Sequence, residues 1–303
     1  GHVPGPYTPI KINGDNVEVI GRKIKLAQTG LPEQIDALGV PILSGAITLS
    51  GILDGDAVSL QAIEPFEFTT IRPDDSAGVA KVKFGPLNGT LKQTVSFDGF
   101  CWYELDLSSD KKFVAENMAL EIRLPKDVAV GYQFAGLESH RVGIDWYEIY
   151  DVLTKDWHLP FTPQIWLGNP KVGIAWIAET YKGWQVANDL KVIDITREKD
   201  SVLLRINIVD EPIELSGKLK LAFGLQGTPV KPIDARTMRM MWLPGRYNDA
   251  MPEAEAYGVY CGQNKGPLWG LYAGLPGPNN PELCLKEVKR QENTGIMPVP
   301  YSV

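Results

Sequence analysis

Short segments that alternate polar and apolar residues, separated by turn residues, fill most of this 303-residue chain. Alternation places successive side chains on opposite faces of a strand, as in a sheet that is packed on one side. Strands are expected at 16–20, 45–49, 67–71, 79–84, 97–107, 119–125, 190–196, 202–209 and 217–224. Because scarcely a helix interrupts this series, the pattern predicts a mainly β fold, a β-sandwich of antiparallel strands.

Two connections in this series are distinctive. Asn88-Gly89 predicts a hairpin turn, because both residues tolerate positive φ. Residues 132–155 are rich in aromatic and polar side chains and are expected to form an excursion between sheets.

The segment from Gln164 to Trp184, QIWLGNPKVGIAWIAETYKGW, predicts the central hairpin of the fold. Its two apolar runs are separated by Gly-Asn-Pro at 168–170, a combination that favours a chain reversal. Trp166 and Trp176 are expected to be buried, because large aromatic side chains usually anchor a core. A sugar-stacking platform is the alternative interpretation of the same aromatic residues.

Composition and charge exclude several classes of function. A net charge of −7 argues against a nucleic-acid-binding protein, which needs a basic face. No window approaches eighteen apolar residues without a charge, so no membrane-spanning helix is expected. His2, His140 and His158 are scattered and match no metal motif, and we expect neither a metal nor another cofactor.

Three cysteines rule out a disulfide framework but permit one bridge. Cys261 and Cys284 flank a Gly/Pro-rich loop and make the only plausible pair, with Cys101 left over. Three free thiols remain the alternative.

The composition changes after Pro232, which predicts a β-sandwich domain over 1–233 and a different segment over 234–303. The second segment contains a Gly/Pro-rich loop at 257–281 and then a helix with Asn280 as N-cap and Gly295 at its end. A mostly apolar strand is expected at 296–303. A helix followed by a buried strand is how an α/β unit begins.

Two motifs carry a resemblance to a known family. IWLGNPKVGIAWIAETYKGW, residues 165–184, resembles the hairpin of the non-catalytic N-terminal β-sandwich domain of glycoside hydrolase family 123 and its uncharacterised relatives. AFGLQGTPVKP, residues 222–232, is similar to the closing strand of that domain, and SFDGFCWYELDL, residues 96–107, to an earlier strand. Order and spacing agree over roughly the last two-thirds of the chain, and the first sixty residues match less well.

The resemblance implies that a (β/α)₈ barrel follows the sandwich and hydrolyses β-linked N-acetylgalactosaminides with the substrate's acetamido group as nucleophile, assisted by an adjacent Asp-Glu pair. Residues 234–303 are far fewer than the about 250 that such a barrel needs. The only adjacent pair, Asp210-Glu211, precedes Pro212 in an expected sandwich turn, so no catalytic residue is assigned. We therefore expect a fragment with a truncated or split barrel, completed by a second polypeptide or by a missing C-terminal barrel.

Two functions remain on this basis. The first is the non-catalytic sandwich portion of a glycoside hydrolase acting on β-linked N-acetylhexosaminides or related glycans, with this chain alone inactive. The alternative is a stand-alone carbohydrate-binding or structural module. Carbohydrate is the expected ligand in both, with Glu179, Trp184, Trp242 and Arg246 as candidate contacts. A secreted or periplasmic location is expected, although the N-terminus GHVPGPYTPIKI contains no signal peptide.

Overall fold

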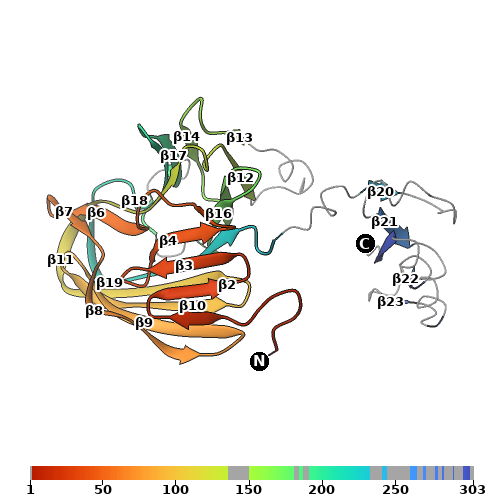
Figure 1. Cartoon of the computed structure of the whole chain (residues 1–303). Helices are drawn as coiled ribbons and strands as arrows, with labels where there is room; N and C mark the ends of the chain where they lie inside the picture. Colours follow the sequence, from red (N-terminus) through yellow and green to blue (C-terminus); the bar gives the residue numbers. More distant parts are fainter. Residues whose placement is uncertain are drawn as a thin grey trace. The chain divides into compact units, whose positions relative to one another are not determined.

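The computed structural model describes residues 2–135, 150–180, 184–186 and 191–232, with the short segments 241–243, 260–264, 269–270, 277–278, 282, 289 and 296–300. It divides into two compact units, Gly1–Pro232 and Ile233–Val303. The first unit is mainly β with antiparallel pairing throughout its sheets, which confirms the predicted antiparallel β-sandwich but not the α/β segment expected after it (Figure 1). Among the described residues no helix is long and apolar enough to cross a membrane.

A five-stranded antiparallel sheet opens the chain in the order β1-β2-β3-β4-β5. Its strands are β1 Lys11–Asn13, β2 Asn16–Val19, β3 Arg22–Leu26, β4 Pro32–Ala37 and β5 Val40–Pro41. The sequence predicted only the strand at 16–20. The burial of alternate residues in β3, with Ile24 and Leu26 inside, shows that this sheet covers part of the core with one face.

A fourteen-stranded sheet makes up the rest of the first unit. Its strands are β6 Thr48–Leu53, β7 Asp56–Ser59, β8 Gln61–Ile71, β9 Asp75–Phe84, β10 Leu87–Ser96, β11 Phe100–Pro125, β12 Gly131–Ala135, β13 Tyr150–Asp151, β14 Trp157–Leu159, β15 Gln164–Gly168, β16 Gly173–Ile177, β17 Ile193–Arg197, β18 Ser201–Val209 and β19 Ile213–Thr228.

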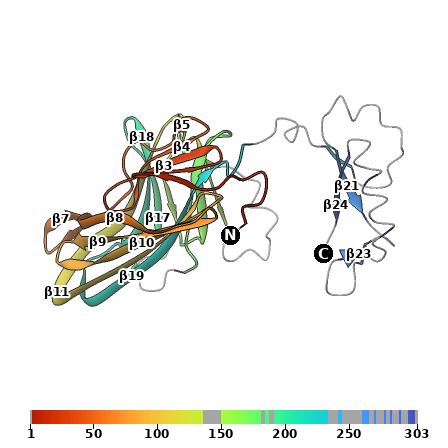
Figure 2. The ribbon, with the colours of Figure 1, turned by 60° about the horizontal axis from the view of Figure 1, so that its bottom comes forward.

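The large sheet forms two layers, and the long strand β11 belongs to both of them (Figure 2). Its first half pairs with β10 on one side and with β19 on the other. Its second half pairs instead with β6 and β18, after register shifts between Ser109 and Phe113 and between Ala115 and Asn117. We call the sheet β8-β9-β10-β11-β19-β16 layer A, and the sheet β7-β6-β11-β18-β17 layer B. The sequence predicted two separate strands here, at 97–107 and 119–125.

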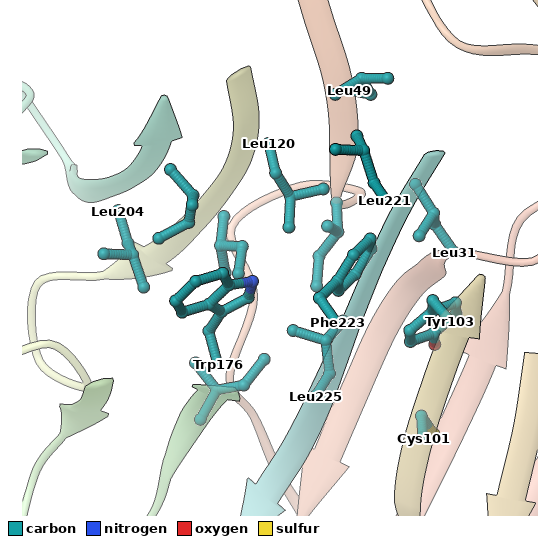
Figure 3. Packing of buried hydrophobic residues seen from close by; sticks show 14 of the residues in the cluster. Leu31, Leu49, Cys101, Tyr103, Leu120, Trp176, Leu204, Leu221, Phe223 and Leu225 are labelled. Carbon is teal, nitrogen blue, oxygen red and sulfur yellow. The ribbon is translucent and has the colours of Figure 1, made fainter. Parts of the chain in front are cut away.

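Apolar side chains from both layers meet in one core (Figure 3). Layer A contributes Trp176 and Phe223, and layer B contributes Leu120 and Leu204, all buried. Tyr103 stacks on Phe223 with ring centroids 5.1 Å apart. Because buried apolar area supplies most of the free energy of folding, this interface is what holds the layers together.

The predicted hairpin turn at Asn88-Gly89 is wrong. The strands β9 and β10 are joined at Gly85-Pro86, where Gly85 has a φ of 55°, and Asn88 pairs with Lys83 inside the ladder. Burial decides the register, because Phe84 and Leu87 both point into the core. The glycine at 89 has another role: a Cβ there would lie 1.9 Å from the carbonyl oxygen of Asp106 on β11.

The central hairpin is confirmed as β15 and β16, which pair antiparallel. Asn169 makes the turn, because its Oδ1 accepts hydrogen bonds from the backbone N–H groups of Lys171 and Val172 at 2.8 and 3.0 Å. Trp176 is buried as predicted, with 1% of its surface exposed. Trp166 is only half-buried, because it lies on the opposite face from its buried neighbours Ile165 and Leu167.

The other segments differ in detail from the prediction. The excursion expected at 132–155 contains the antiparallel pair β12 and β13, with residues 136–149 outside the described part. The strand pair predicted around 197–200 is confirmed as β17 and β18. Cys101 is a free, buried thiol, whereas the side chains of Cys261 and Cys284 lie outside the described residues.

The second unit contains a small parallel sheet in which β21 lies between β20 and β24. Its strands are β20 Met241–Leu243, β21 Tyr260–Asn264 and β24 Ile296–Pro300, and a separate pair consists of β22 Trp269–Gly270 and β23 Gly277–Pro278. The helix expected from 280 to 295 is described only at Glu282 and Lys289, which are helical.

Candidate functional site

The outer face of layer A carries a groove with a volume of about 450 Å³. This volume lies within the range of roughly 300–1,000 Å³ that is usual for ligand sites. The groove belongs entirely to the first unit. It is lined by Thr90, Lys92, Trp102, Glu104, Leu105, Asp106, Glu179, Thr180, Trp184, Lys220, Leu221 and Ala222.

Alternation along β11 places its polar residues in this groove. Tyr103 and Leu105 are buried in the core, so Trp102, Glu104 and Asp106 project from the other face. This pattern supplies an indole and two carboxylates at every second position of one strand.

Strand register brings lysines to these carboxylates. Lys92 of β10 is the cross-strand partner of Glu104, and Lys220 of β19 is the cross-strand partner of Asp106. Residues directly opposite each other in an antiparallel pair lie close enough for their side chains to interact. Lys220 Nζ lies 2.7 Å from Asp106 Oδ2, and the hydrogen bond from Lys220 lowers the pKa of Asp106 below its ordinary value.

A glycine lets two aromatic side chains, one of which lines the groove, lie against the sheet. Phe100 and Trp102 are neighbours on the outer face, with ring centroids 6.2 Å apart and an interplanar angle of 34°. A Cβ at Gly224 of β19 would lie 2.5 Å from Phe100 Cζ and 3.4 Å from Trp102 Cε3. Both rings therefore rest over this glycine, and the half-buried indole of Trp102 lines the groove.

The segment after β16 forms one wall of the groove. Pairing of β16 with β19 ends at Ile177 and Gly224, and the chain then carries Glu179 and Trp184 to the groove beside Leu221 and Ala222 of β19. Glu179 is exposed. Trp184 is half-buried and packs against the core, with ring centroids 5.8 Å from Trp176 and 5.7 Å from Phe161.

The structure thus brings two of the four predicted contact residues, Glu179 and Trp184, into one groove. Trp242 lies in β20 of the second unit, and its side chain is outside the described part. Arg246 lies outside the described residues altogether.

Five residues of the groove were not predicted from the sequence: Lys92, Trp102, Glu104, Asp106 and Lys220. A signal for three of them is present, because Trp102, Glu104 and Asp106 alternate with buried residues in a strand that was predicted. A tryptophan on the polar face of a strand is a reason to suspect a ligand surface. The two lysines gave no such signal, since only strand register places them here.

The groove offers the chemistry that a sugar requires. Indole faces contact the apolar C–H faces of a sugar ring, and carboxylates and ammonium groups form hydrogen bonds with its hydroxyl groups. Within the described ranges, no three His, Cys, Asp or Glu side chains are grouped so that they could hold a metal ion. His158 instead contacts Asp194, with Nδ1 2.6 Å from Oδ1.

Comparison with known proteins gives a family match. Residues 10–197 match the family described as glycoside hydrolase 123, third domain, which includes β11 and the central hairpin. No curated protein matches the chain.

Several solved structures are also similar. A putative aldose 1-epimerase from Escherichia coli K12 matches with a TM-score of 0.39 and 11% identity, over 73% of this chain and 98% of that chain. A protein from Synechocystis sp. PCC 6803 matches with a TM-score of 0.41 and 12% identity, over 73% of this chain and 95% of that chain. A copper-containing benzylamine oxidase from Hansenula polymorpha matches with a TM-score of 0.38 and 7% identity, over 72% of this chain and 60% of that chain.

Proposed function

The chain belongs to the glycoside hydrolase 123 third-domain family, and we propose on this basis that its sandwich is a non-catalytic, carbohydrate-contacting domain of a glycoside hydrolase. The observation that carries the proposal is the groove on layer A, where the indoles of Trp102 and Trp184 line the same space as three carboxylates and two lysines. Concave sites that combine apolar walls with a few polar groups are typical ligand sites.

The substrate class and the partner belong to the same proposal. The glycan is a β-linked N-acetylhexosaminide or a related glycan, and the catalytic partner is a (β/α)₈ barrel. The parallel pairing of β20, β21 and β24 is the arrangement that such a barrel uses, and we propose the segment from residue 234 as its beginning. A secreted or periplasmic location is proposed with it, because polymeric glycans are met outside the cytoplasm.

The carbohydrate contact is tested by titrating the chain with N-acetylgalactosamine and with N-acetylglucosamine. Tryptophan fluorescence and calorimetry measure the binding. Trp102→Ala is expected to weaken binding at least tenfold, because it removes the half-buried indole that lines the groove. Trp157→Ala is the matched control, since it removes another half-buried indole that does not line the groove. Equal loss of affinity in both variants, or no binding by the unaltered chain to either sugar or to their β-linked oligomers, would contradict the proposal.

We expect the chain alone to leave aryl N-acetyl-β-galactosaminides uncleaved. Substrate-assisted hydrolysis needs an acid that can protonate the leaving oxygen. Asp210-Glu211 lies between β18 and β19, where Glu211 is exposed, and Asp106 is held as a carboxylate by Lys220. A chromogenic assay checks this expectation, and turnover that Asp210→Asn or Glu211→Gln abolishes would contradict it.

A further inference from the structure

A second hollow lies beside the groove on the same face of layer A. It has a volume of about 330 Å³. It is lined by Thr69, Ala77, Gly78, Val79, Lys92, Gln93, Thr94, Trp102 and Glu104. Lys92, Trp102 and Glu104 line both hollows, so the two spaces meet along a shared wall with the indole of Trp102 in it.

The hollows are arranged across the strands. Val79, Lys92, Glu104 and Ala222 are successive cross-strand partners on β9, β10, β11 and β19. The second hollow continues past β9 to Thr69 of β8. Five adjacent strands at a spacing of about 4.8 Å extend over about 19 Å. This distance is several times the length of one sugar ring, so a single sugar would leave most of the surface uncovered.

The charges of this surface nearly cancel, with a small excess of carboxylates. Across both hollows, Lys92 and Lys220 face three carboxylates, those of Glu104, Asp106 and Glu179. The second hollow adds no charged residue of its own, since its other lining residues are Thr, Ala, Gly, Val and Gln. A site for sulfated or uronate-containing chains needs an excess of cations, and this surface has one net negative formal charge.

We propose that the two hollows form one binding site for an extended, uncharged glycan that crosses layer A from β19 to β8, with a sugar ring near its middle stacked on Trp102. The proposal rests on the proposed function and specifies its ligand. A chain of sugars fits better than one sugar because each further ring covers groove surface without a second loss of translational freedom.

The test is calorimetric titration of the whole chain with N-acetylglucosamine, chitobiose and chitotetraose. Affinity is expected to rise at least tenfold from the monosaccharide to the tetrasaccharide. Thr94→Arg, which places a long side chain in the second hollow only, is expected to reduce the affinity for chitotetraose to that for chitobiose and to leave chitobiose unaffected. Thr70→Arg is the matched control, because Thr70 is also an exposed threonine and lines neither hollow.

The outcomes separate the two proposals. The same affinity at every length, or equal effects of Thr94→Arg and Thr70→Arg, would overturn the extended site and leave the sugar contact standing. Binding of a chondroitin sulfate tetrasaccharide more tightly than chitotetraose would overturn the uncharged ligand. Absence of binding by all of these glycans would overturn the extended site, and the proposed carbohydrate contact would fall with it if N-acetylgalactosamine and its β-linked oligomers also failed to bind.

Discussion

At the scale of single residues, the environment of a side chain sets its chemistry here. Cys101 and Trp102 are adjacent in β11, yet Cys101 is buried in the core and Trp102 lines the groove. Burial raises the pKa of the Cys101 thiol to about 12. Because the thiolate is the reactive form, the thiol is inert in the folded protein.

We therefore predict that iodoacetamide at pH 8 leaves Cys101 unmodified in the native protein and modifies it fully in urea. Peptide mass spectrometry gives the result for Cys101 separately from Cys261 and Cys284. Rapid alkylation of Cys101 under native conditions would show that the core opens at this position.

Asp106 illustrates the opposite effect, because the hydrogen bond from Lys220 lowers its pKa from the ordinary value of 3.8. Because the pKa of Asp106 is lower in the folded state than in the unfolded state, the small stabilisation from this pair is complete above pH 3.8. It is lost as the pH falls through the folded-state pKa. The Lys220 and Asp106 side chains are 66% and 48% exposed, so the effect on stability is small.

An NMR titration of the Asp106 carboxyl group is accordingly expected to have its midpoint below 3.8, and Lys220→Met should return the midpoint towards that value. A midpoint that Lys220→Met does not change would exclude the lysine as the cause.

At the scale of elements, the central hairpin separates two tryptophans by face. Trp176 is inside the core, and its indole N–H has no hydrogen-bond partner among the described residues. Trp166 is outside, where its indole lies over Gly168 and Gly173 and donates a hydrogen bond to Thr228 Oγ1 at 2.9 Å. The hairpin thus anchors the core with one face and attaches to β19 with the other.

Trp176→Ala is predicted to lower the free energy of unfolding by about 3–5 kcal/mol, the range for deleting a large core side chain. Trp166→Ala should cost about 2 kcal/mol, because it removes partly exposed apolar surface and one hydrogen bond. Urea denaturation of the two variants checks the order. A larger loss of unfolding free energy for Trp166→Ala would mean that the outer face of the hairpin contributes more to stability than its core face.

Elements were easier to predict than their arrangement. Alternation identified most strands of layers A and B, because one buried face leaves a clear period of two. It divided β11 in two at the polar residues 108–112, although Ser108 and Ser109 pair with β19 and the pairing resumes at Phe113 after a register shift. The Asn-Gly signal at 88–89 was likewise overridden by the burial of Leu87.

For the candidate site, too, single residues could be predicted from the sequence but their arrangement across strands could not. Glu179 and Trp184 could be placed near a groove because they end an apolar strand. The row that joins Lys92, Glu104 and Ala222 crosses the consecutive strands β10 and β11 and then β19, which follows more than a hundred residues later in the chain. A single sequence does not fix the register between such segments, so the lysines of the groove could not be predicted.

At the scale of the whole molecule, Arg22 ties the small sheet to the end of the large one. The buried guanidinium donates hydrogen bonds to the carbonyl oxygen of Gly227 at 2.8 Å and to that of Val230. These carbonyl groups lie just before the second unit begins at Ile233. The first sheet of the chain therefore fixes the last strand of the first unit.

Arg22→Met is predicted to reduce the free energy of unfolding by about 2–3 kcal/mol, because two buried carbonyl groups lose charged donors. Amide hydrogen exchange at Gly227 and Thr228 should accelerate most. Arg72→Met is the control, since Arg72 makes an exposed pair with Asp75 and should change stability much less than Arg22→Met. Unchanged exchange at Gly227 in Arg22→Met would contradict this role.

The pairing of β11 with β19 has a consequence for biosynthesis. Residues 100–115 of β11 meet residues 213–226 of β19, so about a hundred residues must leave the ribosome between one partner and the other. Hairpins such as β9 with β10 can form early, because their partners are adjacent in the chain. Until β19 has been synthesised, one edge of β11 stays unpaired. This edge and its alternating apolar residues can then pair with a non-native strand. The strand that unites the two layers is thus also where the nascent chain is most exposed to misassembly.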